Sequence, residues 1–225
     1  MNKFKLRLNK IYNYVFKEKF YKKINIDWSN FPNRSEIIQN IIDYKNYKSY
    51  LEIGCDNDFN FNKIKIETKL GVDPVSGGNI KKTSDEFFFD NKIFFDCIFI
   101  DGLHEYEQVK RDIENSLNYL NDGGVVFVHD CMPRSFFEQA VPRSQHVWTG
   151  DVWKSIIELR TRDNLDTCVA HLDMGLGIIL KRKNSNRLKI NIRNFKDLRF
   201  KQYYQNYESY LNLINHNKII NFIDK

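Results

Sequence analysis

The sequence is poor in the features that mark membrane-spanning and disulfide-stapled proteins. No apolar run approaches the roughly 18 to 20 residues that cross a bilayer. The 4 cysteines are widely spaced, form no CxxC pair and follow no secretory signal; they are Cys55, Cys97, Cys131 and Cys168. Neither a zinc site nor a disulfide framework is predicted, and we expect a reducing, cytoplasmic location.

The chain also lacks internal repeats and low-complexity linkers. Its 225 residues, 42% hydrophobic and 28% charged, are typical of one large globular α/β domain. Positive charge is concentrated in residues 1–23, which hold eight Lys or Arg and one acid, Glu18. The net charge of +6 therefore leaves the rest of the chain at −1. No basic stripe with interleaved aromatics follows, which argues against nucleic-acid binding.

Apolar residues recur at three- and four-residue spacing in this basic arm. They are Leu8, Ile11, Tyr12, Val15, Phe16 and Phe20. The spacing predicts an amphipathic helix whose opposite face is rich in lysine. We expect its apolar stripe to pack on the body or on a second subunit of a homo-oligomer, or to lie on an anionic membrane surface. Residues 1–32 are assigned to this helix and a loop.

Short apolar strands alternate with helices over residues 33–182. Strands are expected near 50–54, 70–74, 94–100 and 125–128, and helices after Asn33, between 54 and 70, over 106–120 and around 152–160. This βαβ alternation predicts an α/β fold with a parallel sheet. Two last strands, near 167–171 and 177–180, resemble an antiparallel edge.

The C-terminal extension, residues 183–225, is polar and aromatic. Its spacing predicts a helix built on Tyr203, Tyr204, Tyr207, Tyr210, Leu211, Leu213 and Ile214. Three roles stay open for this helix, namely a lid, a subunit contact or added packing.

Glycine and polar residues follow the predicted strands, where open parallel sheets bind ligands. These ends read Glu52-Ile53-Gly54-Cys55-Asp56, Asp73-Pro74, Asp101-Gly102-Leu103-His104 and His129-Asp130-Cys131. Gly54 lets the backbone approach a ligand, and Asp73 is placed to accept hydrogen bonds from ribose hydroxyls. A pyrophosphate would require GxGxxG, whereas residues 54–59 read GCDNDF. A nucleoside cofactor without a pyrophosphate is therefore favoured over NAD.

Together these motifs resemble those of class I S-adenosylmethionine-dependent methyltransferases. Residues 51–55 (LEIGC) match the first cofactor motif and residues 71–74 (GVDP) the second. Residues 83–88, 99–106 and 123–130 resemble the group called methyltransferase domain 24. The resemblance covers roughly residues 34–181. It implies a Rossmann-like, doubly wound sheet of about seven strands with helices on both faces.

The resemblance also implies a cofactor site and a substrate class. The methionine and ribose parts of S-adenosylmethionine would be contacted by Glu52, Gly54 and Asp73. The adenine would be approached by Ser84 or Asp85. Asp101 would be a further cofactor-binding residue. Members of the group are largely O-methyltransferases of small molecules and glycans, so a small-molecule or sugar hydroxyl is the expected acceptor.

Two rival functions follow from what the motifs lack. Asp56 and Asp58 replace the further glycines of the first motif, which leaves open a catalytically silent binding or scaffold protein. A nucleotide-sugar or NAD oxidoreductase is the other enzyme considered, and the missing GxGxxG argues against it.

Asp101 and Asp130 end strands that we expect to be neighbours. Adjacent strands lie about 5 Å apart, so the two carboxylates could share one divalent cation, with Mg²⁺ as the natural candidate. Related O-methyltransferases hold a metal at these strand ends. Cys131 stands where some relatives carry Asn or Asp, and His129 would suit only a softer metal. The alternative is that Asp101 begins a turn and Asp130 caps the next segment.

His104 lies three residues after Asp101 and is the candidate general base. A neutral imidazole near pH 7 can remove the proton of an attacking hydroxyl. Asp101 is the second predicted catalytic residue. The alternative is a histidine that anchors its loop. Residues 133–151, rich in aromatic residues and arginine, predict a substrate cap suited to a sugar or to a carboxylated or phosphorylated acceptor.

Overall fold

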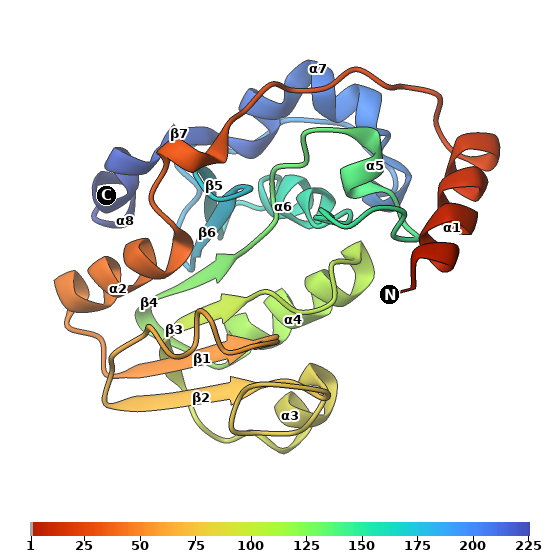
Figure 1. Ribbon diagram of the computed structural model, residues 1–225. Helices are drawn as coiled ribbons and strands as arrows, with labels where there is room; N and C mark the ends of the chain where they lie inside the picture. Colours follow the sequence, from red (N-terminus) through yellow and green to blue (C-terminus); the bar gives the residue numbers. More distant parts are fainter. Residues whose placement is uncertain (1) are drawn as a thin grey trace.

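The computed structural model describes residues 2–225, so that Met1 of the predicted arm lies outside it. Within this range seven strands form one sheet in the order β2-β1-β3-β4-β6-β5-β7 (Figure 1). They are β1 (Ser49–Ile53), β2 (Thr68–Val72), β3 (Phe95–Ile100), β4 (Leu120–Val128), β5 (Asp166–His171), β6 (Leu176–Leu180) and β7 (Leu213–Asn215). β6 pairs antiparallel with β4 and β5, and the other pairs are parallel. The predicted Rossmann-like α/β fold class is confirmed.

Helices cover both faces of the sheet. One apolar core lies under α2 (Arg34–Lys45) and α8 (Ile219–Ile223). The other lies under α3 (Ser84–Asp90), α4 (Tyr106–Asn118), α6 (Trp153–Leu159) and α7 (Phe200–Leu211). The remaining helical segments are α1 (Lys3–Phe16), α5 (Phe136–Gln139) and the 3₁₀ turns Trp28–Asn30, Phe195–Asp197 and His216–Lys218.

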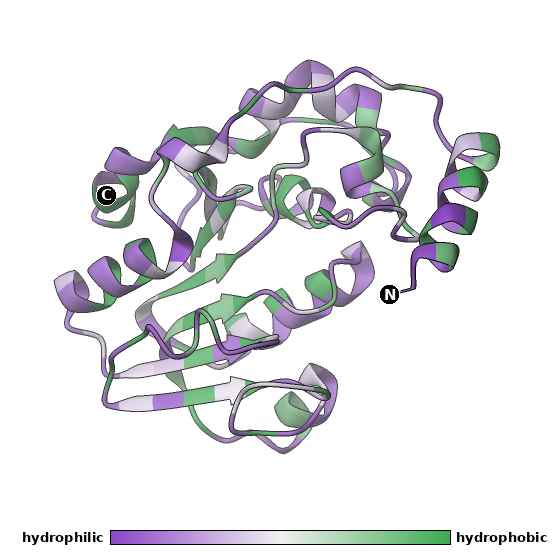
Figure 2. Cartoon of the chain, viewed as in Figure 1, coloured by the Kyte–Doolittle hydropathy of each residue, from purple (hydrophilic) through white to green (hydrophobic). Residues whose placement is uncertain are grey.

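The later halves of the two central strands, residues 97–100 of β3 and 125–128 of β4, are apolar throughout because they face a core on each side. In β3, Cys97 and Phe99 point to the α2 side, and Ile98 and Ile100 to the α4 side. Figure 2 shows this hydrophobic colouring on the middle strands. Strands buried on both faces are expected to read as continuous apolar runs.

The register brings the carboxyl ends of four strands to one edge. Ile53 of β1 pairs with Val72 of β2 and with Ile100 of β3, and Ile100 pairs with Val128 of β4. The residues that follow these strands are therefore neighbours, as the βαβ pattern predicted.

The prediction of a helix between residues 54 and 70 is wrong. Residues 54–67 form successive turns, and Phe61 and Ile64 fill the core on the α2 side without a helix. Asp56 and Asp58 adopt positive φ values of 46° and 62°. Aspartate tolerates this left-handed conformation in turns, and it is incompatible with a continuous α-helix.

The predicted C-terminal helix ends earlier than its spacing suggested. Asn212 has a left-handed φ of 49° and caps α7. Leu213 and Ile214 then enter β7, which extends the sheet beside β5. Residues 122–124 lie within β4, where the pairing with β3 shifts.

The N-terminal helix forms where predicted but turns its apolar stripe outward. Leu8, Ile11 and Phe16 are exposed, so the expected packing of this stripe on the body is wrong. Phe20 leaves the helix and packs against Phe200 and Tyr204. Among residues 2–225, no helix is both long and apolar enough to cross a membrane.

Candidate active site

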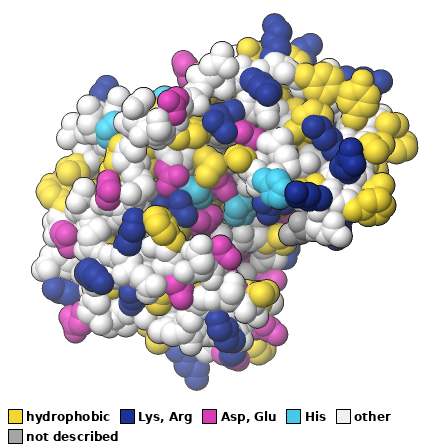
Figure 3. Space-filling view, in the orientation of Figure 1, with side chains coloured by type: hydrophobic (Ala, Val, Ile, Leu, Met, Phe, Trp, Pro, Cys, Tyr) yellow, Lys and Arg dark blue, Asp and Glu magenta, His cyan; other side chains and the backbone are white. Residues whose placement is uncertain are grey.

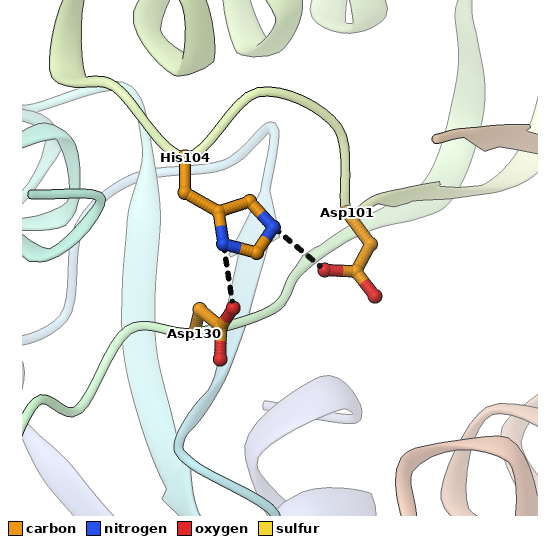
Figure 4. A group of neighbouring side chains, drawn as sticks. All are labelled: Asp101, His104 and Asp130. Atoms are coloured by element: carbon orange, nitrogen blue, oxygen red, sulfur yellow. Dashed lines mark ion pairs between the residues drawn. The ribbon is translucent and has the colours of Figure 1, made fainter. Parts of the chain in front are cut away.

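Asp101, His104 and Asp130 meet at the carboxyl ends of β3 and β4 (Figure 4). His104 lies on the loop between β3 and α4, with its Nε2 3.3 Å from Asp101 Oδ1 and its Nδ1 2.9 Å from Asp130 Oδ2. The three side chains offer ligand atoms within 4.8 Å of one another. The imidazole thus lies between two carboxylates.

Three further charged residues surround this trio. His129 Nδ1 lies 3.2 Å from Asp101 Oδ1, and its Nε2 is 2.8 Å from the Asp173 carbonyl oxygen. Arg34 reaches Asp101 Oδ2 at 3.4 Å and Asp173 Oδ2 at 3.0 Å. Figure 3 shows acidic, basic and histidine side chains gathered at the centre of the displayed face. Acids and bases therefore alternate through the cluster.

Sequence reasoning missed Arg34 and Asp173. Arg34 is the first residue of α2, directly after the Asn33 cap, and Asp173 lies in the turn between β5 and β6. Neither position carries a motif, because both reach the site through tertiary packing.

The neighbouring charges set the protonation of the cluster. Burial alone lowers the pKa of His104, but the carboxylates of Asp130 and Asp101 raise it well above the usual range. Burial likewise lowers the pKa of His129, whereas Asp101 and Asp130 raise it to about 10. Burial raises the pKa of Asp101, yet the two histidines hold it well below its ordinary value. The two carboxylates therefore favour the charged imidazole of His104, whereas the sequence predicted a neutral one.

The segment predicted as a substrate cap, residues 133–151, fixes the position of His104. The Trp148 ring stacks on the imidazole, with ring centroids 5.4 Å apart. Gly150 has a φ of +59°, and a Cβ there would lie 1.6 Å from the His104 carbonyl oxygen. The Asp151 amide donates to that same oxygen at 3.2 Å. Only glycine at position 150 allows this close approach.

The arginines of the same segment are engaged in internal contacts. Arg134 binds Glu138 through Nη2 at 2.7 Å and through Nε at 3.1 Å. Arg143 donates to the carbonyl oxygens of Gln145 and His146. An anionic acceptor would have to displace these partners.

The Asp73 carboxylate joins the loops that follow β1 and β2. Oδ2 accepts hydrogen bonds from the amides of Cys55 and Asp56, each at 3.1 Å. Oδ1 accepts from the amides of Val75 at 2.8 Å and Ser76 at 2.9 Å. Burial opposes ionisation, but these bonds lower the pKa of Asp73. Because a carboxylate has about four acceptor positions, ribose hydroxyls would compete with the loop amides.

The other predicted cofactor residues lie around these loops. Gly54 has a φ of +86°, and a Cβ there would lie 2.3 Å from the Asp101 carbonyl oxygen, so this glycine allows the β1 and β3 loops to touch. Ser84 accepts a hydrogen bond from Gln108 at 3.1 Å. Asp85 lies in the first turn of α3. These residues border one edge of the sheet.

Glu52 is buried beneath the loops. Glu52 is only 1% exposed. Its Oε2 accepts hydrogen bonds from Tyr50 Oη at 2.6 Å and from Asn60 Nδ2 at 2.8 Å. Burial raises the pKa of Glu52 to about 7, although both hydrogen bonds oppose the shift. Sequence reasoning did not include Asn60, which lies in the turns that replace the expected helix.

We expect Glu52→Gln to flatten the pH dependence of stability. The folded state retains a proton that the unfolded chain loses above about pH 4.5, so ionisation of Glu52 lowers the free energy of unfolding as pH rises towards 7. The shift corresponds to roughly 3 kcal/mol. Urea unfolding near pH 5 and pH 8 should show the variant gaining stability relative to wild type at the higher pH. Exposed Glu67→Gln is the control, and equal pH dependence in wild type and Glu52→Gln would contradict this account.

Asp130 carries the strongest sign of a cation site. Its Oδ1 is buried and receives no hydrogen bond from the residues that the structure describes, while His129 Nδ1 lies 3.5 Å away. A buried carboxylate oxygen of this kind needs a donor or a cation. Asp101, Asp130 and His104 would suit Mn²⁺ or Fe²⁺ as well as Mg²⁺.

Cys131 is not placed as a third metal ligand. Its thiol donates to the Val128 carbonyl oxygen at 3.2 Å, and the side chain is fully buried. Burial raises the pKa of this thiol well above its ordinary value, so the thiolate that binds metals is disfavoured.

Known proteins match both the sequence motifs and the fold. Residues 45–131 match a family model described as a methyltransferase domain. An O-methyltransferase from Bacillus cereus in complex with S-adenosylhomocysteine is 11% identical, covers 79% of this chain and 88% of its own, and has a TM-score of 0.50. The S-adenosylhomocysteine-bound methyltransferase PaMTH1 of Podospora anserina is 16% identical, with 67% and 78% covered and a TM-score of 0.50. No curated protein matches the sequence.

The chain therefore has the fold of class I S-adenosylmethionine-dependent methyltransferases, and residues 45–131 are similar to the methyltransferase domain that the family model describes. The resemblance predicted from the strand-end motifs is confirmed.

Proposed function

We propose that the protein transfers the methyl group of S-adenosylmethionine to a hydroxyl of a small molecule, with sugars as the first acceptor class. The observation that carries this proposal is the Asp101–His104–Asp130 cluster at the carboxyl ends of β3 and β4 in a methyltransferase fold. Ligands of open α/β sheets bind at this edge. The proteins of similar fold from Bacillus cereus and Podospora anserina were both solved with S-adenosylhomocysteine bound.

In this proposal the loops after β1 and β2 hold the cofactor. Asp73 orients the amides of Cys55 and Asp56, and Gly54 keeps that loop against Asp101. Glu52 supports the loop from below through Asn60. Bound S-adenosylmethionine would supply the sulfonium methyl group.

The cluster would align and activate the acceptor. Asp130 Oδ1, which lacks a hydrogen bond within the described chain, can accept one from the acceptor hydroxyl and would take up its proton as the oxygen attacks the methyl group. The charged imidazole of His104 would stabilise negative charge that develops on the acceptor oxygen, and Asp101 holds that imidazole in place. Proton removal by His104 itself requires the neutral imidazole, which its two carboxylates disfavour. Catalysis would rest mainly on alignment and charge placement.

In an alternative arrangement, a divalent cation held by Asp101, Asp130 and the neutral imidazole of His104 would take the place of the imidazole's proton and polarise the acceptor hydroxyl. We expect wild type to bind Mn²⁺ in calorimetric titration and Asp130→Asn to bind it at least about tenfold more weakly, since the neutral amide removes one anionic ligand. Because the third ligand is a nitrogen, His104→Gln should weaken Mn²⁺ more than Mg²⁺. Exposed Asp122→Asn is the matched control, and equal affinity in Asp130→Asn and this control would rule out the cation site.

Transfer of a labelled methyl group from S-adenosylmethionine tests the proposed reaction. The acceptors are free sugars, glycosides and small phenols, and the product is identified by mass spectrometry. The proposal predicts a methyl ether and an equal amount of S-adenosylhomocysteine. Labelled product on nitrogen alone, from acceptors that offer both groups, would contradict O-methylation.

A second candidate is a silent scaffold that keeps the fold without its cofactor. Two observations favour it, namely the turns that replace a helix after β1 and the four amides that already occupy the Asp73 carboxylate. A folded protein that fails to bind S-adenosylhomocysteine would establish this alternative.

A further inference from the structure

The N-terminal helix α1 is attached to the body by its polar side. Asn13 is fully buried, and its Nδ2 donates to the Pro142 carbonyl oxygen at 2.8 Å. Asn9 Nδ2 donates to the Arg143 carbonyl oxygen at 2.7 Å, and Leu6 is the buried apolar residue of α1. An ordinary surface helix buries its apolar stripe and exposes its polar face. This helix does the reverse.

The opposite side of α1 presents an apolar face to solvent. We call it the outer face, and it consists of Phe4, Leu8, Ile11, Tyr12, Val15 and Phe16. These residues recur at three- and four-residue spacing and so share one side of the helix. Ile11 is 61% exposed and Phe16 is 72% exposed. In Figure 3 hydrophobic side chains gather with basic ones on the lobe where Figure 1 places α1. A contiguous patch of this kind marks an interaction surface.

The charge of α1 is entirely positive. Its basic residues are Lys3, Lys5, Arg7 and Lys10, and Lys17 follows directly. The one acid of the arm, Glu18, is turned inward, where its carboxylate accepts hydrogen bonds from the amides of Phe200 at 2.7 Å and Lys201 at 2.8 Å. The basic residues of α1 therefore remain available to an anionic partner.

An open groove next to the end of α1 is also basic. Its volume is about 790 Å³, and six basic and three acidic side chains line it. Lys17 and Lys19 belong to the arm, while Lys196 and Lys201 come from the C-terminal extension. Positive charge thus continues from the outer face onto the body.

We propose that α1 docks the protein on an anionic lipid surface. The outer face enters the boundary between headgroups and acyl chains, and the flanking lysines bind anionic headgroups. A second copy of the chain fits this surface poorly, because pairing two outer faces would bring two sets of cationic side chains together without an acid in α1 to offset them. Charge complementarity therefore favours lipid as the occupant.

Docking would orient the rest of the molecule. α1 is bonded to Pro142 and Arg143 of residues 133–151, and Trp148 of that segment stacks on His104. The side of the protein that carries this segment would therefore face the lipid. The proposal rests on α1 and does not depend on the reaction proposed above.

Vesicle flotation of the full chain tests the docking surface. The vesicles are phosphatidylcholine alone and phosphatidylcholine with roughly one-third phosphatidylglycerol. We expect wild type to float only with the anionic vesicles. The triple variant Leu8→Ser, Ile11→Ser, Phe16→Ser should bind at least about tenfold more weakly, because it removes apolar area that inserts. The matched control is Val75→Ser, Phe89→Ser, which alters exposed apolar residues of the body and should bind like wild type.

Salt and oligomeric state complete the test. Raising salt from about 0.1 M to about 0.5 M should weaken wild-type binding several-fold, since headgroup attraction is screened. Light scattering should show wild type and the triple variant as monomers of equal thermal stability. Equal flotation of the triple variant and its control would overturn the proposal. So would a wild-type dimer that the triple variant converts to monomer, because the outer face would then be a contact between copies.

Discussion

Replacing His104 with alanine is expected to lower kcat for methyl transfer by about 10²- to 10³-fold, the range typical of losing a group that stabilises developing negative charge. His104 lies between Asp101 and Asp130, and its charge faces the position proposed for the acceptor oxygen. Cofactor affinity should change by less than about threefold, since the loops that hold the cofactor are fixed by Asp73.

His146→Ala is the control for this variant, because His146 is an exposed histidine of the same segment, residues 133–151. It should keep wild-type kcat. His104→Gln adds a second comparison, since glutamine retains hydrogen bonding without the charge and should remain as slow as alanine if charge matters. Full activity in His104→Ala would show that His104 only anchors its loop.

Replacing Asp73 with alanine is expected to weaken S-adenosylhomocysteine binding by at least about 100-fold. The carboxylate is the shared acceptor for four backbone amides, and charge-assisted hydrogen bonds contribute roughly 1.5 to 3 kcal/mol each. Its removal releases both loops, so the thermal midpoint should fall as well. Asp73→Asn should bind S-adenosylhomocysteine almost as weakly as Asp73→Ala, because its amide N–H groups would face backbone N–H donors.

The control for Asp73 is Asp56→Asn. Asp56 is exposed and has a positive φ, which asparagine also tolerates. We expect this variant to bind S-adenosylhomocysteine as tightly as wild type or somewhat more tightly. A loss equal to that of Asp73→Ala would show that the loop binds the cofactor through Asp56 instead.

The strand ends could be predicted from sequence because each is a sharp local signal. Apolar runs break at Gly54, Asp73 and Asp101, and neighbouring parallel strands bring these breaks to one edge. This topology places Asp101 beside Asp130, whereas the position of His104 also depends on its contacts with Trp148 and Gly150.

The remaining site features depend on tertiary geometry that local patterns do not encode. Arg34 and Asp173 reach Asp101 and His129 from distant elements. The charge of His104 arises from two carboxylates that meet only in the fold. The spacing of α1 predicted its helix, but which side faces the body depends on Asn9 and Asn13 finding carbonyl partners more than a hundred residues away.

Calorimetric titration of the full chain with S-adenosylhomocysteine tests the central claim most directly. We expect saturable binding in wild type and in His104→Ala, loss of binding in Asp73→Ala, and no binding of NAD. Absence of any binding by folded wild-type protein would contradict the methyltransferase proposal and support a scaffold that retains only the fold.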